Sequence, residues 1–221
     1  MLKVSAVQYG AVFRLFQLAL ASLVLAAAPA AAKERLVLAF GDSLTAGYQL
    51  PPSDSFPAQL QAALRKSGKA VRVHNAGVSG DTTSSGRARL QWVLKGLKAK
   101  PDLAIVALGA NDMLRGQKVA DTRRNLDAIV GELRRQGVPV IIAGMLSAPN
   151  MGQAYAREYN AVFPAVAKAH DAKLYPFFTA GVTANRAYLL ADGMHPNKGG
   201  VGVMVKGLLP LVTAELDRLP V

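Results

Sequence analysis

The chain of 221 residues contains no cysteine. This absence excludes a disulfide framework, a zinc–thiolate site, a cysteine nucleophile and a lipid anchor attached to cysteine. Acidic residues are scarce, since 14 Asp and Glu stand against 26 Lys and Arg and leave a formal net charge of +12. Hydrophobic residues make up 51% and charged residues 18%, which excludes a disordered protein or a coiled coil. A basic globular protein of ordinary single-domain length remains.

Several other signals are missing as well. The sequence has no internal repeat, low-complexity linker or break in composition after its first segment, so one domain over residues 33–221 is predicted. No His or carboxylate residues occur at metal-ligand spacing, so we expect neither a metal nor another cofactor. The basic residues carry no aromatic interleaving and no known binding motif, which argues against nucleic acid as a partner.

The first 32 residues differ from the rest of the chain. Lys3 and Arg14 precede an uncharged, mostly apolar stretch at 15–32, which ends in Pro29 and three alanines. A positive start, an apolar core and small residues before the cleavage point are typical of a secretory signal peptide. The alternative is an uncleaved anchor, but the apolar stretch is shorter than the roughly 20 residues that span a bilayer. We predict cleavage after Ala32 and a periplasmic or secreted protein.

Short runs that are apolar throughout alternate with longer amphipathic stretches in the remaining chain. Strands are expected at 36–40, 71–73, 103–108, 138–143 and 173–175, and helices at 55–67, 84–97, 121–135, 155–170 and about 200–218. Apolar strands separated by amphipathic helices predict an α/β fold, in which helices cover both faces of a mainly parallel five-stranded sheet. Ligands of such sheets bind at the carboxyl ends of the strands.

Unusual polar and glycine residues follow three of these strands and precede the last helix. The four segments are Gly41–Tyr48, Asn75–Thr82, Leu108–Asp112 and Asp192–Asn197. Each segment alone is a weak signal, but coincidence does not explain four of them in order. Together they resemble the four conserved blocks of the SGNH (GDSL) hydrolase superfamily, and most closely its exported bacterial esterases of the lysophospholipase, thioesterase and arylesterase type. The resemblance covers essentially all of 33–221.

Ser43 is the candidate nucleophile. It follows a strand end and a glycine, which places its hydroxyl at the mouth of the sheet, although a serine in this position can also simply cap a helix. The Gly-x-Ser-x-Gly elbow of α/β-hydrolases is absent around it. The resemblance implies a flavodoxin-like three-layer α/β/α sandwich and a serine esterase that forms an acyl-enzyme on Ser43. Asp42 is a rival acid, to which the resemblance gives a structural role in the loop.

Only three histidines are available as the base. His74 lies in a strand and His170 ends a helix, where a cation suits the helix dipole, so both are expected to be structural or surface residues. His195 follows Asp192 by three residues, and the carboxylate can accept a bond from its Nδ1 across one turn. Such a bond would hold the tautomer whose Nε2 faces Ser43, which predicts a triad in the chain order Ser, Asp, His.

The oxyanion of a tetrahedral intermediate needs preorganised donors. By the resemblance, these donors are the backbone N–H groups of Ser43 and Gly80 and the side-chain amide of Asn111. Gly80 has no side chain that would obstruct its N–H. Taken alone, Gly80 is equally compatible with a plain turn, and Asn111 with an Asx turn.

The segment after the predicted oxyanion asparagine is the candidate substrate loop. Asp112, Met113, Leu114 and Arg115 correspond to a mobile loop that closes over acyl chains in the family that the chain resembles, and ordinary loop packing is the alternative. The apolar residues favour a medium or long acyl group, so small-molecule or lipid acyl esters are the expected partners. The glycine-rich segment 198–202, where relatives begin a firmer helix, is expected to loosen the start of the last helix.

The excess of basic residues needs its own explanation. Arg87, Arg89, Lys95, Lys98 and Lys100 lie together in the sequence without an acid among them. We expect them to form a solvated face, which would draw a monomeric protein toward anionic lipid headgroups at the membrane periphery.

Two other functions stay open on the sequence. A carbohydrate acetylesterase would use the same chemistry on acetylated polysaccharide. A catalytically silent binding protein could share the scaffold, but the complete set of catalytic residue types argues against it.

Overall fold

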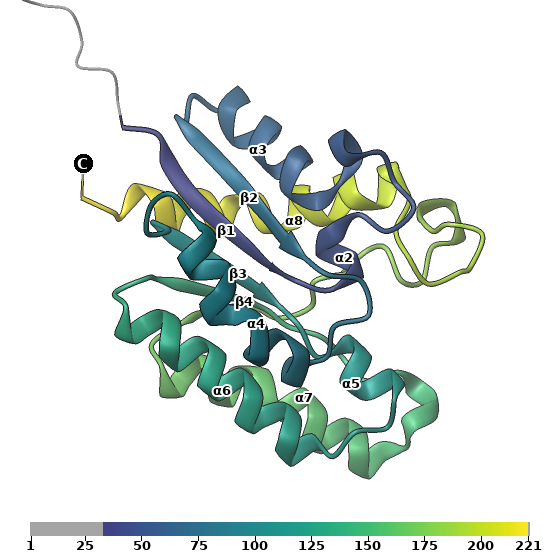
Figure 1. Cartoon of the computed structure of the whole chain (residues 1–221). Coiled ribbons are helices and arrows are strands. Elements are labelled where there is room, and N and C mark those ends of the chain that lie inside the picture. Colours follow the sequence, from purple (N-terminus) through teal and green to yellow (C-terminus); the bar gives the residue numbers. More distant parts are fainter. Residues whose placement is uncertain (1–32, 221) are drawn as a thin grey trace, which may run out of the picture. The chain divides into compact units, whose positions relative to one another are not determined.

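The computed structural model describes residues 33–220, and the predicted signal peptide lies outside the described residues. The centre of the fold is a sheet of five strands (Figure 1). These are β1 (Arg35–Gly41), β2 (Val71–Gly77), β3 (Leu103–Ala107), β4 (Val140–Ala143) and β5 (Lys173–Tyr175), in the order β2-β1-β3-β4-β5. All neighbouring strands are parallel, which confirms the predicted α/β fold and its flavodoxin-like strand order.

The three central strands are apolar throughout because helices cover both of their faces. Every residue of β3 and β4 is buried, and only the first residue of β1 is partly exposed. β2 lies at the edge and alternates between buried and exposed residues. It is longer than the sequence predicted, since 71–77 pairs residue for residue with β1 up to Gly77 opposite Gly41. The sequence did not predict the second half of this strand because it contains polar residues. An edge strand tolerates polar side chains on its open face.

The helices form two layers on either side of the sheet (Figure 1). One layer consists of α3 (Phe56–Lys66) and α8 (Lys198–Asp217), and the other of α4 (Thr83–Gly96), α6 (Val119–Arg135) and α7 (Gln153–Ala169). Two short helices, α2 (Ser43–Ala46) and α5 (Ala110–Leu114), follow β1 and β3 directly, and 3₁₀ turns lie at Pro52–Asp54, Pro149–Met151 and Arg186–Tyr188.

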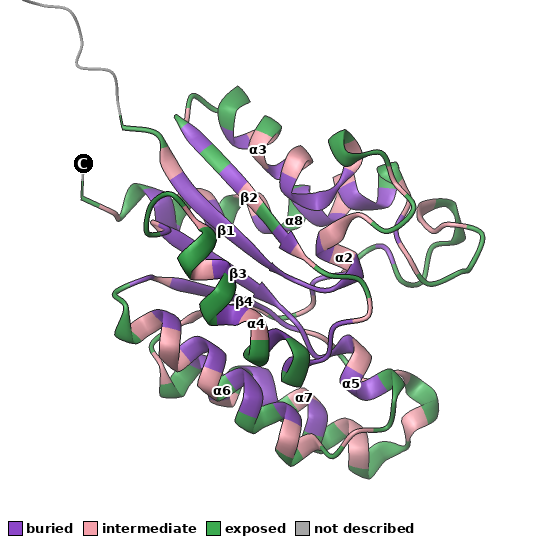
Figure 2. Ribbon diagram, in the orientation of Figure 1, coloured by how far each residue is buried: buried purple, intermediate pink, exposed green. Residues whose placement is uncertain are grey.

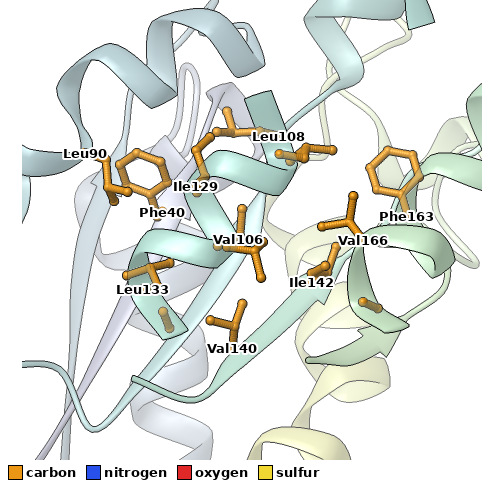
Figure 3. Packing of buried hydrophobic residues seen from close by; sticks show 14 of the residues in the cluster. Phe40, Leu90, Val106, Leu108, Ile129, Leu133, Val140, Ile142, Phe163 and Val166 are labelled. Carbon is orange, nitrogen blue, oxygen red and sulfur yellow. The ribbon is translucent and has the colours of Figure 1, made fainter. Parts of the chain in front are cut away.

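Each helix layer buries an apolar stripe against the sheet, as the buried inner faces in Figure 2 show. In Figure 3, Phe40 of β1 and Val106 of β3 meet Leu90 of α4 and Ile129 of α6, while Phe163 of α7 approaches from the side of β4. Full burial of such a side chain contributes about 1.5–3 kcal/mol, so this packing holds the strand ends in place.

The glycine-rich start of the last helix is not loose, contrary to the expectation from sequence. α8 begins at Lys198, and the Asn197 side chain caps it by accepting a hydrogen bond from the Gly200 N–H at 3.0 Å. A Cβ on Gly200 would lie 2.2 Å from the Tyr188 carbonyl oxygen, so the glycine permits a close approach between helix and loop. Among the described residues, α8 alone is long and apolar enough to cross a membrane, but it packs against α3 and the sheet as a core helix.

The direction in which strands are added to the sheet reverses at one place. After β1 the chain passes through α3 to β2, and it then returns to β3 on the opposite side of β1. The segments that follow β1 and β3 therefore diverge at the carboxyl edge of the sheet, and such a switch point is where open α/β sheets bind ligands. The nucleophile candidate Ser43 follows β1 there, and Asn111 follows β3.

Candidate active site

The turn between β1 and α2 holds Ser43 at the carboxyl edge of the sheet. The Asp42 carboxylate caps α2 by accepting a hydrogen bond from the Leu44 N–H at 3.0 Å. Ser43 is the first residue of this one-turn helix and is 8% exposed. A helix start leaves its first N–H groups without intrahelical partners, so the backbone N–H of Ser43 is available to a ligand.

The loop before α8 brings a base and an acid to this serine. The His195 Nε2 lies 3.0 Å from the Ser43 Oγ, and the His195 Nδ1 lies 2.6 Å from an Asp192 carboxylate oxygen. The other Asp192 oxygen accepts hydrogen bonds from the backbone N–H groups of Met194, at 2.9 Å, and of His195, at 3.0 Å. These backbone bonds, together with the bond to the imidazole, lower the pKa of Asp192 to about 2.

This arrangement suits proton transfer from the serine. A carboxylate on Nδ1 fixes the proton there, so Nε2 presents its lone pair to the Ser43 hydroxyl within the distance that a general base requires. The Tyr48 ring packs against the imidazole, with 4.3 Å between the ring centroids. The structure therefore brings together Ser43, Asp192 and His195, which the sequence had put forward as a triad.

Asp42 lies next to the serine but turns away from the histidine. It is fully buried, and burial raises the pKa of its carboxyl to about 7, with smaller contributions from the nearby Asp81 and Asp112. Its contacts are with the Leu44 N–H and, at 3.4 Å, with the Asn111 side chain. These contacts are those of a residue that holds the turn.

The other two expected oxyanion donors, Gly80 and Asn111, follow β2 and β3 at the same edge of the sheet. Gly80 has a φ of 85°, in the left-handed region that favours glycine, and no hydrogen bond to its N–H is found within the described residues. The Asn111 Nδ2 donates a hydrogen bond to the Asp81 carbonyl at 3.0 Å. An amide nitrogen carries two hydrogens, and the second donates to the Asp42 carboxylate at 3.4 Å, a long bond that an oxyanion could replace.

Two arginines hold this segment, Arg89, which the sequence did not assign to the site, and Arg115, which it placed in the candidate substrate loop. Arg89 donates from Nε to the Asp81 carboxylate at 2.5 Å and from Nη2 to the Gly41 carbonyl at 2.9 Å. Its guanidinium lies 4.2 Å from the centre of the Phe40 ring. The sequence predicted that Arg89 belongs to a solvated face, and this is wrong because the acid that pairs with it lies outside the basic run. Arg115 donates to the Gly80 carbonyl at 2.7 Å.

Comparison with known proteins identifies the fold and the chemistry. Residues 39–202 match the GDSL-like lipase/acylhydrolase family. The chain belongs to this family. An arylesterase of Vibrio mimicus is 38% identical over 172 residues, which cover 78% of this chain and 84% of the relative.

Two further proteins support the assignment. The thioesterase 1/protease 1/lysophospholipase L1 of Escherichia coli (strain K12) is 34% identical over 197 residues, which cover 87% of this chain and 92% of that protein. The crystal structure of AlinE4, an SGNH-hydrolase family esterase, superposes with a TM-score of 0.72 at 43% identity and covers 87% of this chain and 100% of its own. The chain is therefore a hydrolase of carboxylic esters.

Only two of the four residues in the expected substrate loop of this hydrolase are exposed to solvent. Asp112 is fully buried, and its carboxylate accepts hydrogen bonds from the backbone N–H of Thr83 at 2.8 Å and from the Thr83 hydroxyl at 2.5 Å. Met113 belongs to the core between the sheet and α6. Leu114 is 53% exposed and Arg115 is exposed, so these two are the ones that a substrate can reach.

The remaining histidines lie elsewhere on this hydrolase. The His170 Nε2 lies 2.9 Å from an Asp127 oxygen at the end of α7. His74 is partly buried in β2, and burial together with Arg72 lowers its pKa. In the described part of the chain, no three His, Asp or Glu side chains gather closely enough to share a metal ion.

Two hollows on the surface lie away from Ser43, Asp192 and His195. One, of about 570 Å³, is lined by residues at the ends of α6 and α7, including Arg134 and His170. A second, of about 360 Å³, lies between the same two helices. Neither hollow shares a residue with the candidate triad. The side chains of His195 and Asp192 are 18% and 36% exposed to solvent.

Proposed function

We propose that Ser43, His195 and Asp192 are the catalytic triad of this ester hydrolase. The observation that carries the proposal is the 3.0 Å contact between the Ser43 Oγ and the His195 Nε2, which joins residues 152 positions apart in the chain. Asp192 holds the imidazole in the required tautomer and stabilises the imidazolium that forms when His195 takes the serine proton.

The reaction proceeds in two steps on these groups. The Ser43 Oγ attacks the acyl carbonyl while its proton moves to the His195 Nε2, and the imidazolium then protonates the departing alcohol, which leaves an acyl-enzyme. Water next gives its proton to Nε2 and attacks the same carbonyl, and Ser43 recovers its proton as the acid is released. The backbone N–H groups of Ser43 and Gly80 and the Nδ2 of Asn111 donate to the oxyanion in both steps.

The substrates that we propose are esters with an apolar acyl group. The names of the relatives, arylesterase in one case and thioesterase and lysophospholipase in another, indicate that this scaffold accepts several leaving groups. Leu114 is exposed, so an apolar acyl chain of variable length can contact it, which a closed pocket for an acetyl group would not allow. We propose that the protein acts as a monomer.

We also propose that the protein works outside the cytoplasm. The support is the sequence of residues 1–32, which has the charge, apolar core and small residues of a secretory signal peptide. Expression of the full chain followed by N-terminal sequencing of the exported protein tests this, because cleavage after Ala32 gives a mature chain that begins at Lys33. An intact N-terminus on a membrane-bound protein would contradict it.

Labelling with a fluorophosphonate tests the triad directly. We expect the wild-type protein to gain one phosphonyl group, detected by intact mass, and the Ser43→Ala variant to gain none. A catalytically silent protein would stay unlabelled in both forms. Turnover of p-nitrophenyl esters of increasing chain length, measured beside acetylated sugars, separates an acyl esterase from a carbohydrate acetylesterase, because only the latter prefers the sugar acetates.

A further inference from the structure

The exposed large apolar side chains gather at one edge of the molecule. Within residues 33–220 six such side chains are more than about a third exposed. Four of them follow the carboxyl end of a strand, Val78 after β2, Tyr48 after β1, Leu114 after β3 and Leu146 after β4. A fifth, Met194, lies in the loop before α8, and the exposed fractions of the five run from 38% to 53%. We call these five residues the apolar rim.

Contacts place two rim residues beside the histidine. The Tyr48 ring lies against the His195 ring, with 4.3 Å between centroids. Met194 precedes His195, and its backbone N–H donates to the Asp192 carboxylate at 2.9 Å. This part of the apolar rim therefore borders the acid and the base.

The other three rim residues border the oxyanion side. Val78 lies two residues before Gly80, and its backbone N–H donates to the Gly41 carbonyl at 3.0 Å. Leu114 precedes Arg115, which binds the Gly80 carbonyl. Leu146 lies two residues before Ala148, whose backbone N–H donates to the Met113 sulfur at 3.1 Å. Because all five strands are parallel, these segments share one edge of the sheet, with the Ser43 turn among them.

The rim also carries positive charge. Arg115 and Arg186 are both exposed beside it, and their guanidinium groups donate to the backbone carbonyls of Gly80 and Ala191 rather than to carboxylates. The nearby acid Asp192 is paired with His195. The net charge of +12 includes Lys3 and Arg14, so residues 33–221 carry +10 and are attracted to a negatively charged surface. Arg115 and Arg186 place part of this positive charge beside the rim.

We propose that the apolar rim, with Arg115 and Arg186, docks the hydrolase on an anionic lipid surface. Clustered exposed apolar side chains mark an interaction site. A single acyl chain would contact one side of the site, whereas the rim residues border both the side of the histidine and the side of Gly80. Docking presents lipid esters to Ser43, so the inference deepens the proposed function, but the binding itself needs no turnover.

Vesicle binding tests the proposal without hydrolysis. The protein used is the mature chain with Ser43→Ala, sedimented with vesicles of phosphatidylglycerol and phosphatidylcholine in equal parts. We expect binding that weakens with added salt and with phosphatidylcholine alone. Val78→Ser with Leu146→Ser in the same background should bind at least about tenfold more weakly, because these side chains are removed from the apolar contact. Thermal unfolding checks that both proteins are folded.

The one tryptophan of the chain provides the control. Trp92 is the sixth exposed apolar residue, 78% exposed on α4 and outside the rim. If the rim docks, Trp92→Ser leaves vesicle binding unchanged and the emission of Trp92 does not shift when vesicles are added. A blue shift, a loss of binding in Trp92→Ser, equal binding of the rim variant or no binding to anionic vesicles would overturn the proposal. Fluorophosphonate labelling of the wild type reports separately on the triad.

Discussion

The nucleophile turn after β1 and the acid–base loop before α8 meet at one hydrogen bond, but the fold holds them in different ways. In the turn, Asp42 and Ser43 are buried, and the strands on either side of β1 fix the backbone. In the loop, Asp192 and Met194 are exposed, and a few bonds within four residues fix the geometry. The buried side positions the proposed nucleophile through packing, whereas the exposed side positions the proposed base through local hydrogen bonds.

The two regions also treat their carboxylates in opposite ways. Burial excludes water from the Asp42 carboxylate, so its pKa rises to about 7. Asp192 keeps part of its exposure and gains two backbone N–H donors, so its pKa falls to about 2. The acid needed as a permanent anion thus lies in the exposed loop, and the one that holds the buried turn is easily protonated.

The largest effect should come from breaking the link between the two regions. We expect His195→Ala to lower kcat by about 10⁴–10⁶-fold, because the serine then has no base. Steady-state hydrolysis of a p-nitrophenyl ester measures it, and His170→Ala, at the far end of α7, should keep normal turnover. A His195→Ala enzyme with most of its activity would remove this histidine from the mechanism.

On the buried side, Asn111→Ala should lower kcat by about 10²–10³-fold, because one oxyanion donor is lost. Since the Asn111 amide also binds the Asp81 carbonyl, thermal unfolding must show that the variant is folded. Near-normal turnover in a folded variant would mean that the oxyanion is stabilised by the two backbone donors alone.

The free energy of unfolding should depend on pH in opposite ways through Asp42 and through Asp192. Because the pKa of Asp42 rises from 3.8 to about 7, the folded state binds more protons there, and this group lowers the free energy of unfolding as pH rises from about 4 to about 7. Asp42→Asn should remove that decline, which urea unfolding across this range measures as the difference between variant and wild type.

Asp192 is the matched control. Its pKa lies below the usual value, so the stability it contributes is present above about pH 4 and is lost as pH falls toward about 2. Asp192→Asn should therefore leave the slope between pH 4 and 7 as in the wild type. A slope that survives in Asp42→Asn and disappears in Asp192→Asn would reverse our assignment.

The smallest effect concerns the anchor of the acid–base loop. Gly200→Ala should lower the free energy of unfolding by about 1–3 kcal/mol, because the new Cβ would meet the Tyr188 carbonyl. Gly202→Ala, two residues further along α8, meets nothing closer than 3.5 Å and should raise it by about 0.5–1 kcal/mol through helix propensity. Equal effects in urea unfolding would show that the contact with Tyr188 does not constrain the loop.

Local patterns were enough to place the strands, apart from the second half of β2, and to put forward the residues that we propose as the triad. β3 and β5 appear where their apolar runs predicted them, within one residue, because a short apolar segment bounded by turns has few other ways to be buried. Asp192 and His195 were readable as a pair because three residues separate them, so a single turn brings them together.

Contacts between distant segments decided the rest. No pattern within the sequence shows that Arg89 reaches Asp81 and Gly41, or that Asp112 turns inward to Thr83, because each contact depends on how α4 packs on the sheet. The apolar rim likewise exists only because parallel strands end at one edge of the sheet. The sequence alone determined which groups are available for chemistry, since residue type and local spacing set their reactivity. The tertiary structure decided which of them meet, since burial and distance arise only when separate segments pack together.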